Sequence, residues 1–156
     1  ISTEKYHKIK KVSAQKLKWE KEEIYGYGTG NSWFEDVFRN DSLKKYASEA
    51  DIAYMKLQYE QDTVAYWEKK QLNSFRVIDS LQKTKATRQN WLLRFLGNYS
   101  YYGFSTPLYS LKGNLLVIKE EFACGFMCAD WCTYIYIIDP KTGKWKQFAR
   151  FACISA

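Results

Sequence analysis

All four cysteines of the chain lie near its C-terminal end, at Cys124, Cys128, Cys132 and Cys153. Residues 1–123 contain no cysteine. Thiols form disulfides or bind metal ions, so cross-linking chemistry is confined to this end of the chain. The first three cysteines are spaced by four residues, and on one continuous strand neighbouring members would lie about 13 Å apart. Disulfide-bonded Cα atoms usually lie within about 7 Å of each other. Pairing within this group therefore requires a turn, and Gly125 favours an irregular loop or tight turn over residues 124–130.

The four cysteines allow three disulfide pairings, and the sequence does not choose among them. A hairpin folded about residues 139–144 places Cys132 opposite Phe151 and one diagonal step from Cys153. Cys132–Cys153 is therefore a candidate cross-strand bridge, which leaves Cys124 and Cys128 as the other pair. Disulfides indicate an oxidising compartment, so we expect an extracytoplasmic location: periplasmic, surface-anchored or secreted.

Metal sites and free thiols are the alternatives for these cysteines. Zinc prefers two closely spaced cysteine pairs, often C-x2-C, whereas this chain has C-x3-C-x3-C followed by a distant fourth cysteine. The same spacing departs from the runs that hold iron–sulfur clusters. Free, buried cysteines in a cytosolic protein are the third reading. We expect disulfides, without a metal ion or a cofactor.

Few other residues have the chemistry of a catalytic centre. His7 is the only histidine and is far in sequence from every cysteine, so an exposed helix position suits it better than a Cys–His pair. Glu120 and Glu121 would place one carboxylate on each face of a strand. No nucleophile elbow, histidine-based metal motif or P-loop occurs. An enzyme is thus the less favoured hypothesis, and we assign no catalytic residue.

Composition indicates one globular domain, because 46% of the 156 residues are hydrophobic and 26% are charged. The formal charge of +7 is spread along the chain. Its most promising cluster, Lys83, Lys85, Arg88 and Arg94 beside Trp91, is more typical of a solvated helix face than of a nucleic-acid interface. No apolar run reaches the roughly 18 residues that a membrane-spanning helix requires. We expect neither a membrane span nor a nucleic-acid partner.

Glycine and proline are absent from residues 31–96 and frequent afterwards. This contrast predicts a single domain over residues 1–156, with a helical part over about 1–97 and a sheet part over about 98–156. Helical spacing predicts one helix over about residues 3–23 and a second that begins at residues 40–42. The apolar stripe of the second helix includes Tyr54, Leu57 and Trp67, and continues at Leu72 and Ile78 in the same or a third helix. Residues 91–96 fit a helix or a buried strand.

Aromatic and β-branched residues predict four strands, over residues 99–104, 115–122, 133–138 and 145–151. Pro140 and Gly143 predict a tight hairpin over 139–144. The third strand is apolar on both faces, as a central strand would be, and the fourth has the alternation of an outer strand. The sequence thus predicts an α+β fold, in which N-terminal helices pack on a C-terminal antiparallel β-meander of about four strands.

The C-terminal pattern resembles one in uncharacterised exported or lipid-anchored bacterial proteins, in which C-G-x-x-C-G and G-x-W lie in an antiparallel meander. The resemblance covers about residues 104–155, and its most specific parts are Cys124-Gly125, Cys128 and Gly143 to Trp145. This chain departs from the pattern at Ala129, where glycine is usual, and by adding Cys132 and Cys153. The resemblance implies export and a meander, and it implies no activity.

We expect an exported bacterial binding or assembly module without catalytic activity, whose disulfide-linked sheet presents aromatic surface to a protein or glycan partner. The candidate partner-binding residues are Phe126, Met127, Asp130 and Trp131, because large apolar groups in a cross-linked loop are pre-organised for binding. An inhibitor or immunity-type protein that occludes an acidic toxin or enzyme is the alternative, since the chain is basic. A hydrolase or redox enzyme that uses a cysteine is the third hypothesis.

Overall fold

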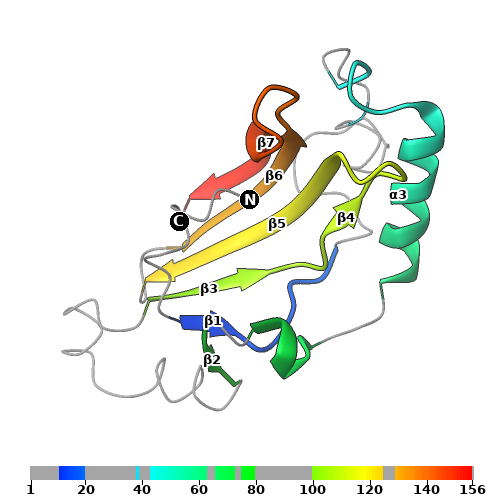
Figure 1. The fold of residues 1–156 in the computed structure, drawn as a ribbon. Helices are drawn as coiled ribbons and strands as arrows, with labels where there is room; N and C mark the ends of the chain where they lie inside the picture. The colour runs from blue at the N-terminus through cyan, green and yellow to red at the C-terminus, as the bar shows by residue number, and fades with distance from the viewer. Residues whose placement is uncertain are drawn as a thin grey trace, which may run out of the picture.

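The computed structural model describes residues 11–19, 38, 43–62, 66–72, 75–79, 100–124 and 129–155. Within them, seven strands form one mixed sheet in the order β2-β1-β3-β5-β6-β7, and β4 pairs with β5 on the edge that β3 also uses (Figure 1). The strands are β1 (Lys11–Ser13), β2 (Arg76–Ile78), β3 (Ser100–Phe104), β4 (Leu108–Tyr109), β5 (Leu115–Cys124), β6 (Ala129–Ile138) and β7 (Trp145–Ser155). The sheet is accompanied by the α-helix α3 (Glu49–Gln61) and the 3-10 helix η1 (Lys69–Leu72).

The predicted first helix is wrong in the part that the structure describes. Residues 11–13 form β1, where Val12 is fully buried and pairs in parallel with Val77 of β2 and Tyr102 of β3. The chain then stays extended, and the Leu17 N–H donates to the Phe104 carbonyl at 2.9 Å. Pairing with strands that are distant in sequence outweighs the local helical spacing of the apolar residues, because strand preference depends on tertiary context.

The second helix begins later and ends earlier than the sequence predicts. Residues 43–46 form a turn, and α3 begins at Glu49 with Ser48 as its N-cap. After α3 ends at Gln61, Leu72 lies in η1 and Ile78 lies in β2 rather than in a helix. The α+β prediction of helices on a four-strand meander is therefore wrong, since the described residues form mainly a mixed sheet that includes strands from both halves of the chain.

The four predicted C-terminal strands are confirmed where the structure describes them. They correspond to β3, β5, β6 and β7, and β5 to β7 form an antiparallel meander. The hairpin over 139–144 is also confirmed: the Asp139 N–H donates to the Lys144 carbonyl at 2.9 Å, and Gly143 has φ +65°. As predicted, β6 lies inside the sheet and β7 is last in the strand order.

Strand β5 is apolar on both faces, and a different element covers each face. Leu115 and Val117 point to the face where Met55 of α3 packs. Leu116 and Ile118 point to the opposite face, where they cluster with Leu72 of η1. The continuous apolar run at the start of β5 therefore requires a covering layer on each face of the sheet, and α3 and η1 contribute to these layers.

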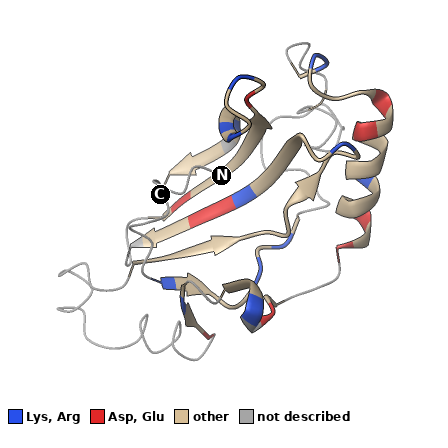
Figure 2. Cartoon of the chain, viewed as in Figure 1, with Lys and Arg blue, Asp and Glu red and all other residues tan. Residues whose placement is uncertain are grey.

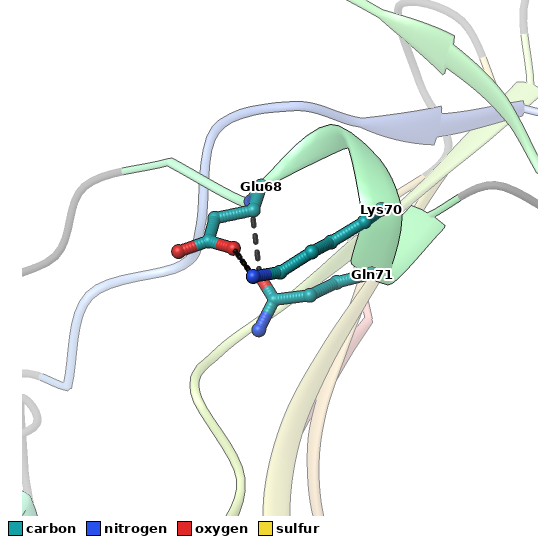
Figure 3. A network of polar contacts seen from close by, with 3 residues as sticks. All are labelled: Glu68, Lys70 and Gln71. Carbon is teal, nitrogen blue, oxygen red and sulfur yellow. Dashed lines mark hydrogen bonds and ion pairs between the residues drawn. The ribbon is translucent and has the colours of Figure 1, made fainter.

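A small polar network sets the start of η1 (Figure 3). The Glu68 N–H donates to Gln71 Oε1 at 2.9 Å, and Lys70 Nζ lies 2.7 Å from Glu68 Oε2. These side chains are exposed, so the ion pair contributes little to stability. The turn places Trp67 and Leu72 against the sheet on either side of this network.

Asp51 joins the first turn of α3 to the turn between β4 and β5. Its side chain is only 2% exposed. Oδ2 accepts hydrogen bonds from the hydroxyl and the N–H of Ser48, at 2.6 and 2.9 Å, and Oδ1 accepts one from the Lys112 N–H at 3.3 Å. The side-chain bond from Ser48 is the largest cause that lowers the pKa of Asp51, and it acts against the effect of burial.

The lowered pKa makes Asp51 a pH-dependent source of stability. Its contribution is present above the unfolded-state pKa of about 3.9 and is lost as the pH falls through the lower folded-state pKa. We expect Asp51→Asn to lower the free energy of unfolding at pH 7 by about 1–3 kcal/mol, since an amide cannot accept all three bonds. The difference from the wild type should shrink below about pH 4, as urea denaturation across this range would show.

Glu49→Gln is the matched control for this prediction. It removes the same charge from the same helical turn, but Glu49 is exposed. We expect a much smaller loss, due to the helix dipole alone. Equal losses for the two variants at pH 7 would contradict the role given to Asp51.

Candidate binding surface

A disulfide joins Cys132 of β6 to Cys153 of β7, which is the candidate cross-strand bridge among the three possible pairings. Cys132 is buried and Cys153 is exposed. The bond ties the C-terminal half of the outer strand to its neighbour. Cys128 and the side chain of Cys124 lie outside the described residues, so their predicted pairing stays a prediction.

The route to this pairing differs from the simple hairpin register. Strand β7 shifts register against β6 at two points, and the first shift, between Ile135 and Tyr136, pairs Phe151 with Thr133 rather than with Cys132. The second shift lies between residues 131 and 133 of β6, and it brings Cys153 to Cys132. Irregularities of this kind add a residue to one strand and redirect its side chains. The disulfide therefore depends on the irregular register of β7.

The predicted irregular loop or tight turn over residues 124–130 extends too far at both ends. Cys124 is the last residue of β5, and Ala129 and Asp130 belong to β6. Asp130 and Trp131 are adjacent in that strand, so their side chains point to opposite faces of the sheet and do not form one surface. Phe126 and Met127 lie outside the described residues.

Glu120 is buried on the sheet face that η1 covers, the face of Leu116 and Ile118. Glu121 points to the opposite face, which α3 covers. Glu120 pairs with Phe104 and Cys132, and so lies beside the disulfide. Burial first, and then the charge of Glu120, raise the pKa of Tyr102 and of Tyr134. Both phenols therefore keep their protons to higher pH than an exposed tyrosine does. The two glutamates, being on opposite faces, do not form a paired-carboxylate site.

The described ranges contain no cluster of three or more His, Cys, Asp or Glu side chains that could hold a metal ion. His7 is outside these ranges. Among the same residues, no helix is long and apolar enough to cross a membrane.

Four exposed apolar side chains lie on neighbouring elements, but they do not share one face. Tyr54 and Leu57 belong to α3, Tyr109 to β4 and Leu111 to the turn that follows, and their exposed fractions run from 41% to 62%. They are four of the seven large apolar side chains that are exposed in the described part of the chain. Tyr109 pairs with Leu116 and lies near Trp145, on the sheet face opposite α3. We call the other three residues, Tyr54, Leu57 and Leu111, the α3–β4 patch. Such groupings mark interaction sites more often than single exposed apolar residues do.

The α3–β4 patch is built on hydrogen-bonded elements. The Gln58 side chain accepts from the Tyr109 N–H at 3.1 Å and donates to the Tyr109 carbonyl at 2.7 Å. One amide therefore satisfies both backbone groups of Tyr109 on the β4 edge, as a neighbouring strand would. The Asp51–Lys112 bond holds the adjoining turn. Helix, strand and turn are thus fixed relative to one another (Figure 1).

The helical spacing places Tyr54 and Leu57 in the apolar stripe that faces the core, so the sequence does not predict this patch. The buried positions of α3 are instead Asp51, Met55 and Tyr59, which share one face at four-residue spacing. A further signal in the sequence is the Ser48-x-x-Asp51 capping box, which fixes the start of the helix.

No family model, curated protein or solved structure matches the chain. The C-terminal resemblance to exported proteins therefore stays an expectation.

The disulfide gives a direct stability prediction. Replacing both partners, as Cys132→Ala and Cys153→Ala together, should lower the free energy of unfolding by about 3 kcal/mol, because the closed loop restricts the unfolded chain. Chemical denaturation of the oxidised proteins measures this loss. Equal stability of the double variant and the wild type would contradict a stabilising role for the bond.

Proposed function

We propose that this chain is an exported binding or assembly module without catalytic activity, and that it presents the α3–β4 patch to a protein or glycan partner. The observation that supports the proposal is that Tyr54, Leu57 and Leu111 are exposed on a helix and a turn that a hydrogen bond joins. Of the residues favoured by the sequence, Asp130 and Trp131 lie on opposite sheet faces, and a binding role for Phe126 and Met127 stays a prediction.

Pre-organisation is the physical support for binding at this patch. Association costs free energy when side chains and loops must be ordered at the interface. Here Gln58 and Asp51 already hold the backbone of β4 and of the turn. Tyrosine and leucine side chains then offer apolar area, at about 25 cal/mol for each Å² removed from water. Tyrosine also contributes a hydroxyl, which suits a partner with polar groups.

The Cys132–Cys153 disulfide supports export. Structural disulfides persist in oxidising compartments and are rare in the cytosol. The resemblance of residues 104–155 to exported bacterial proteins agrees with this placement.

Selection from a displayed library of random peptides, with a glycan array beside it, tests the binding proposal. We expect ligands that bind the wild type and bind the double variant Leu57→Ser and Leu111→Ser about 10-fold more weakly, a loss of about 1.4 kcal/mol. The matched control is Val77→Ser with Ile154→Ser, which removes two exposed apolar side chains away from the patch. Ligands that distinguish neither double variant from the wild type, or that lose affinity equally for both, would contradict the proposal.

Thiol trapping in cells that produce the protein naturally tests the export proposal. We expect Cys132 and Cys153 to resist alkylation under native conditions and to react after reduction, as peptide mass mapping would show. Extensive alkylation of both residues before reduction would overturn the assignment to an oxidising compartment.

A further inference from the structure

The two partners of the disulfide differ in access to solvent. Cys153 is exposed, whereas Cys132 is only 6% exposed. Cys153 belongs to β7, the last strand in the order of the described sheet, and Cys132 belongs to β6, which lies inside it (Figure 1). The bond therefore runs from the edge of this sheet toward its interior. Thiol–disulfide exchange depends on which of the two sulfurs an incoming thiolate can reach.

The strand order decides the direction from which each sulfur can be attacked. A thiolate attacks a disulfide in line with the sulfur–sulfur bond, on the side opposite the sulfur that leaves. For attack on Cys153, this line extends outward past β7, beyond which the described part of the chain has no further strand. For attack on Cys132, the line extends over β5, which pairs with the other edge of β6. Cys153 is thus the sulfur with an open line of approach.

The residue of β5 that lies opposite Cys132 is Glu120. Directly paired residues point to the same face of a sheet, with Cβ atoms about 4.5–5.5 Å apart. Glu120 is itself buried, at 5% exposure, and Figure 2 shows the acidic stretch of β5 in red beside β6. Its side chain therefore lies on the line of approach to Cys132, where the negative charge repels an incoming thiolate.

We propose that Cys153 is a thiol-exchange site of the folded protein, at which an external thiolate forms a mixed disulfide while Cys132 leaves as a thiolate. The bond between Cys132 and Cys153 breaks, and one bond forms between Cys153 and the incoming sulfur. The electron pair of the broken bond stays on Cys132, so the incoming thiolate is oxidised as Cys132 is reduced. The site lies on the sheet face opposite α3, and it adds a covalent chemistry to the proposed binding function.

The fold also favours the reverse step. Phe151 pairs with Thr133, and Ile154 pairs with Trp131, so the two strands are paired on both sides of the disulfide. These backbone contacts hold Cys132 beside Cys153 after the sulfur–sulfur bond breaks. Groups held together in this way react at a high effective concentration. The Cys132 thiolate therefore attacks Cys153 again and expels the external thiol, which makes the mixed disulfide short-lived.

Reaction of the oxidised wild type with 2-mercaptoethanol tests the site of attack. Samples are quenched with acid at early times, and peptide mass mapping locates the adducts. We expect adducts on Cys153 to exceed those on Cys132 by about 10-fold or more, since access decides which sulfur reacts. The same reaction in concentrated guanidinium is the control, and there the two residues should react about equally. Adducts on Cys132 that equal or exceed those on Cys153 in the folded protein would overturn the proposal.

Small thiols and dithiol proteins both carry the reacting group. A thioredoxin whose second active-site cysteine is replaced by serine provides the protein arm, because it stays attached as a mixed disulfide. Initial rates compared at equal thiolate concentration identify the faster of the two sources. We expect attachment through Cys153 in both arms. Attachment of either thiol mainly through Cys132 would refute Cys153 as the exchange site.

Glu120→Gln tests the role of the neighbouring carboxylate. A leaving thiolate at Cys132 forms beside this charge, and a less stable thiolate leaves more slowly. We expect the variant to raise the initial rate of adduct formation on Cys153 by about 3- to 10-fold. Glu121→Gln is the matched control, since the adjacent side chain points to the opposite face and its loss should leave the rate unchanged. A retained preference for Cys153 shows that each variant is folded, and equal rates for both would contradict the role of Glu120.

Discussion

The structure depends on β5, a strand that is apolar on both faces and paired on both edges. Its neighbours are β6 on one edge and β3 with β4 on the other. Leu115 and Leu116 are both almost fully buried although they point in opposite directions. A strand of this kind is stable only inside a sheet with apolar cover on each side. The packing of α3 on one face and of η1 on the other follows from this requirement.

The interactions that attach α3 to the sheet also shape its outer surface. Met55 and Tyr59 fill the core, whereas Asp51 and Gln58 bond to the backbone of the turn and of β4. A buried carboxylate is costly to desolvate, so its three hydrogen bonds are necessary for the helix to sit here. Because the helix is fixed in this way, its remaining apolar side chains are presented on a fixed frame. Stability and the proposed binding function thus use the same contacts.

Local patterns predicted what is local in this fold. The hairpin at Pro140 and Gly143 and the four C-terminal strands follow from turn chemistry and residue type. The parallel pairing of Val12 depends on strands far away in the sequence, and no local pattern encodes it. The candidate surface was missed because helical spacing alone does not say which face is buried. The buried face of α3 includes Asp51, a polar residue that hydrophobic spacing does not assign to the core. The sequence made Cys132–Cys153 a candidate pairing without choosing it, and it did not predict the register shifts that bring the two residues together.

The central claim is that helix, β4 and turn form one pre-organised surface. Native-state hydrogen exchange of the Tyr109 and Lys112 amides tests it most directly, because these N–H groups donate to Gln58 and Asp51 of α3. We expect both amides to exchange as slowly as the amides of β5, and their exchange rates to depend on denaturant in the same way. Rapid exchange of Tyr109 and Lys112 while β5 remains protected would mean that α3 detaches readily, and would contradict a pre-organised surface.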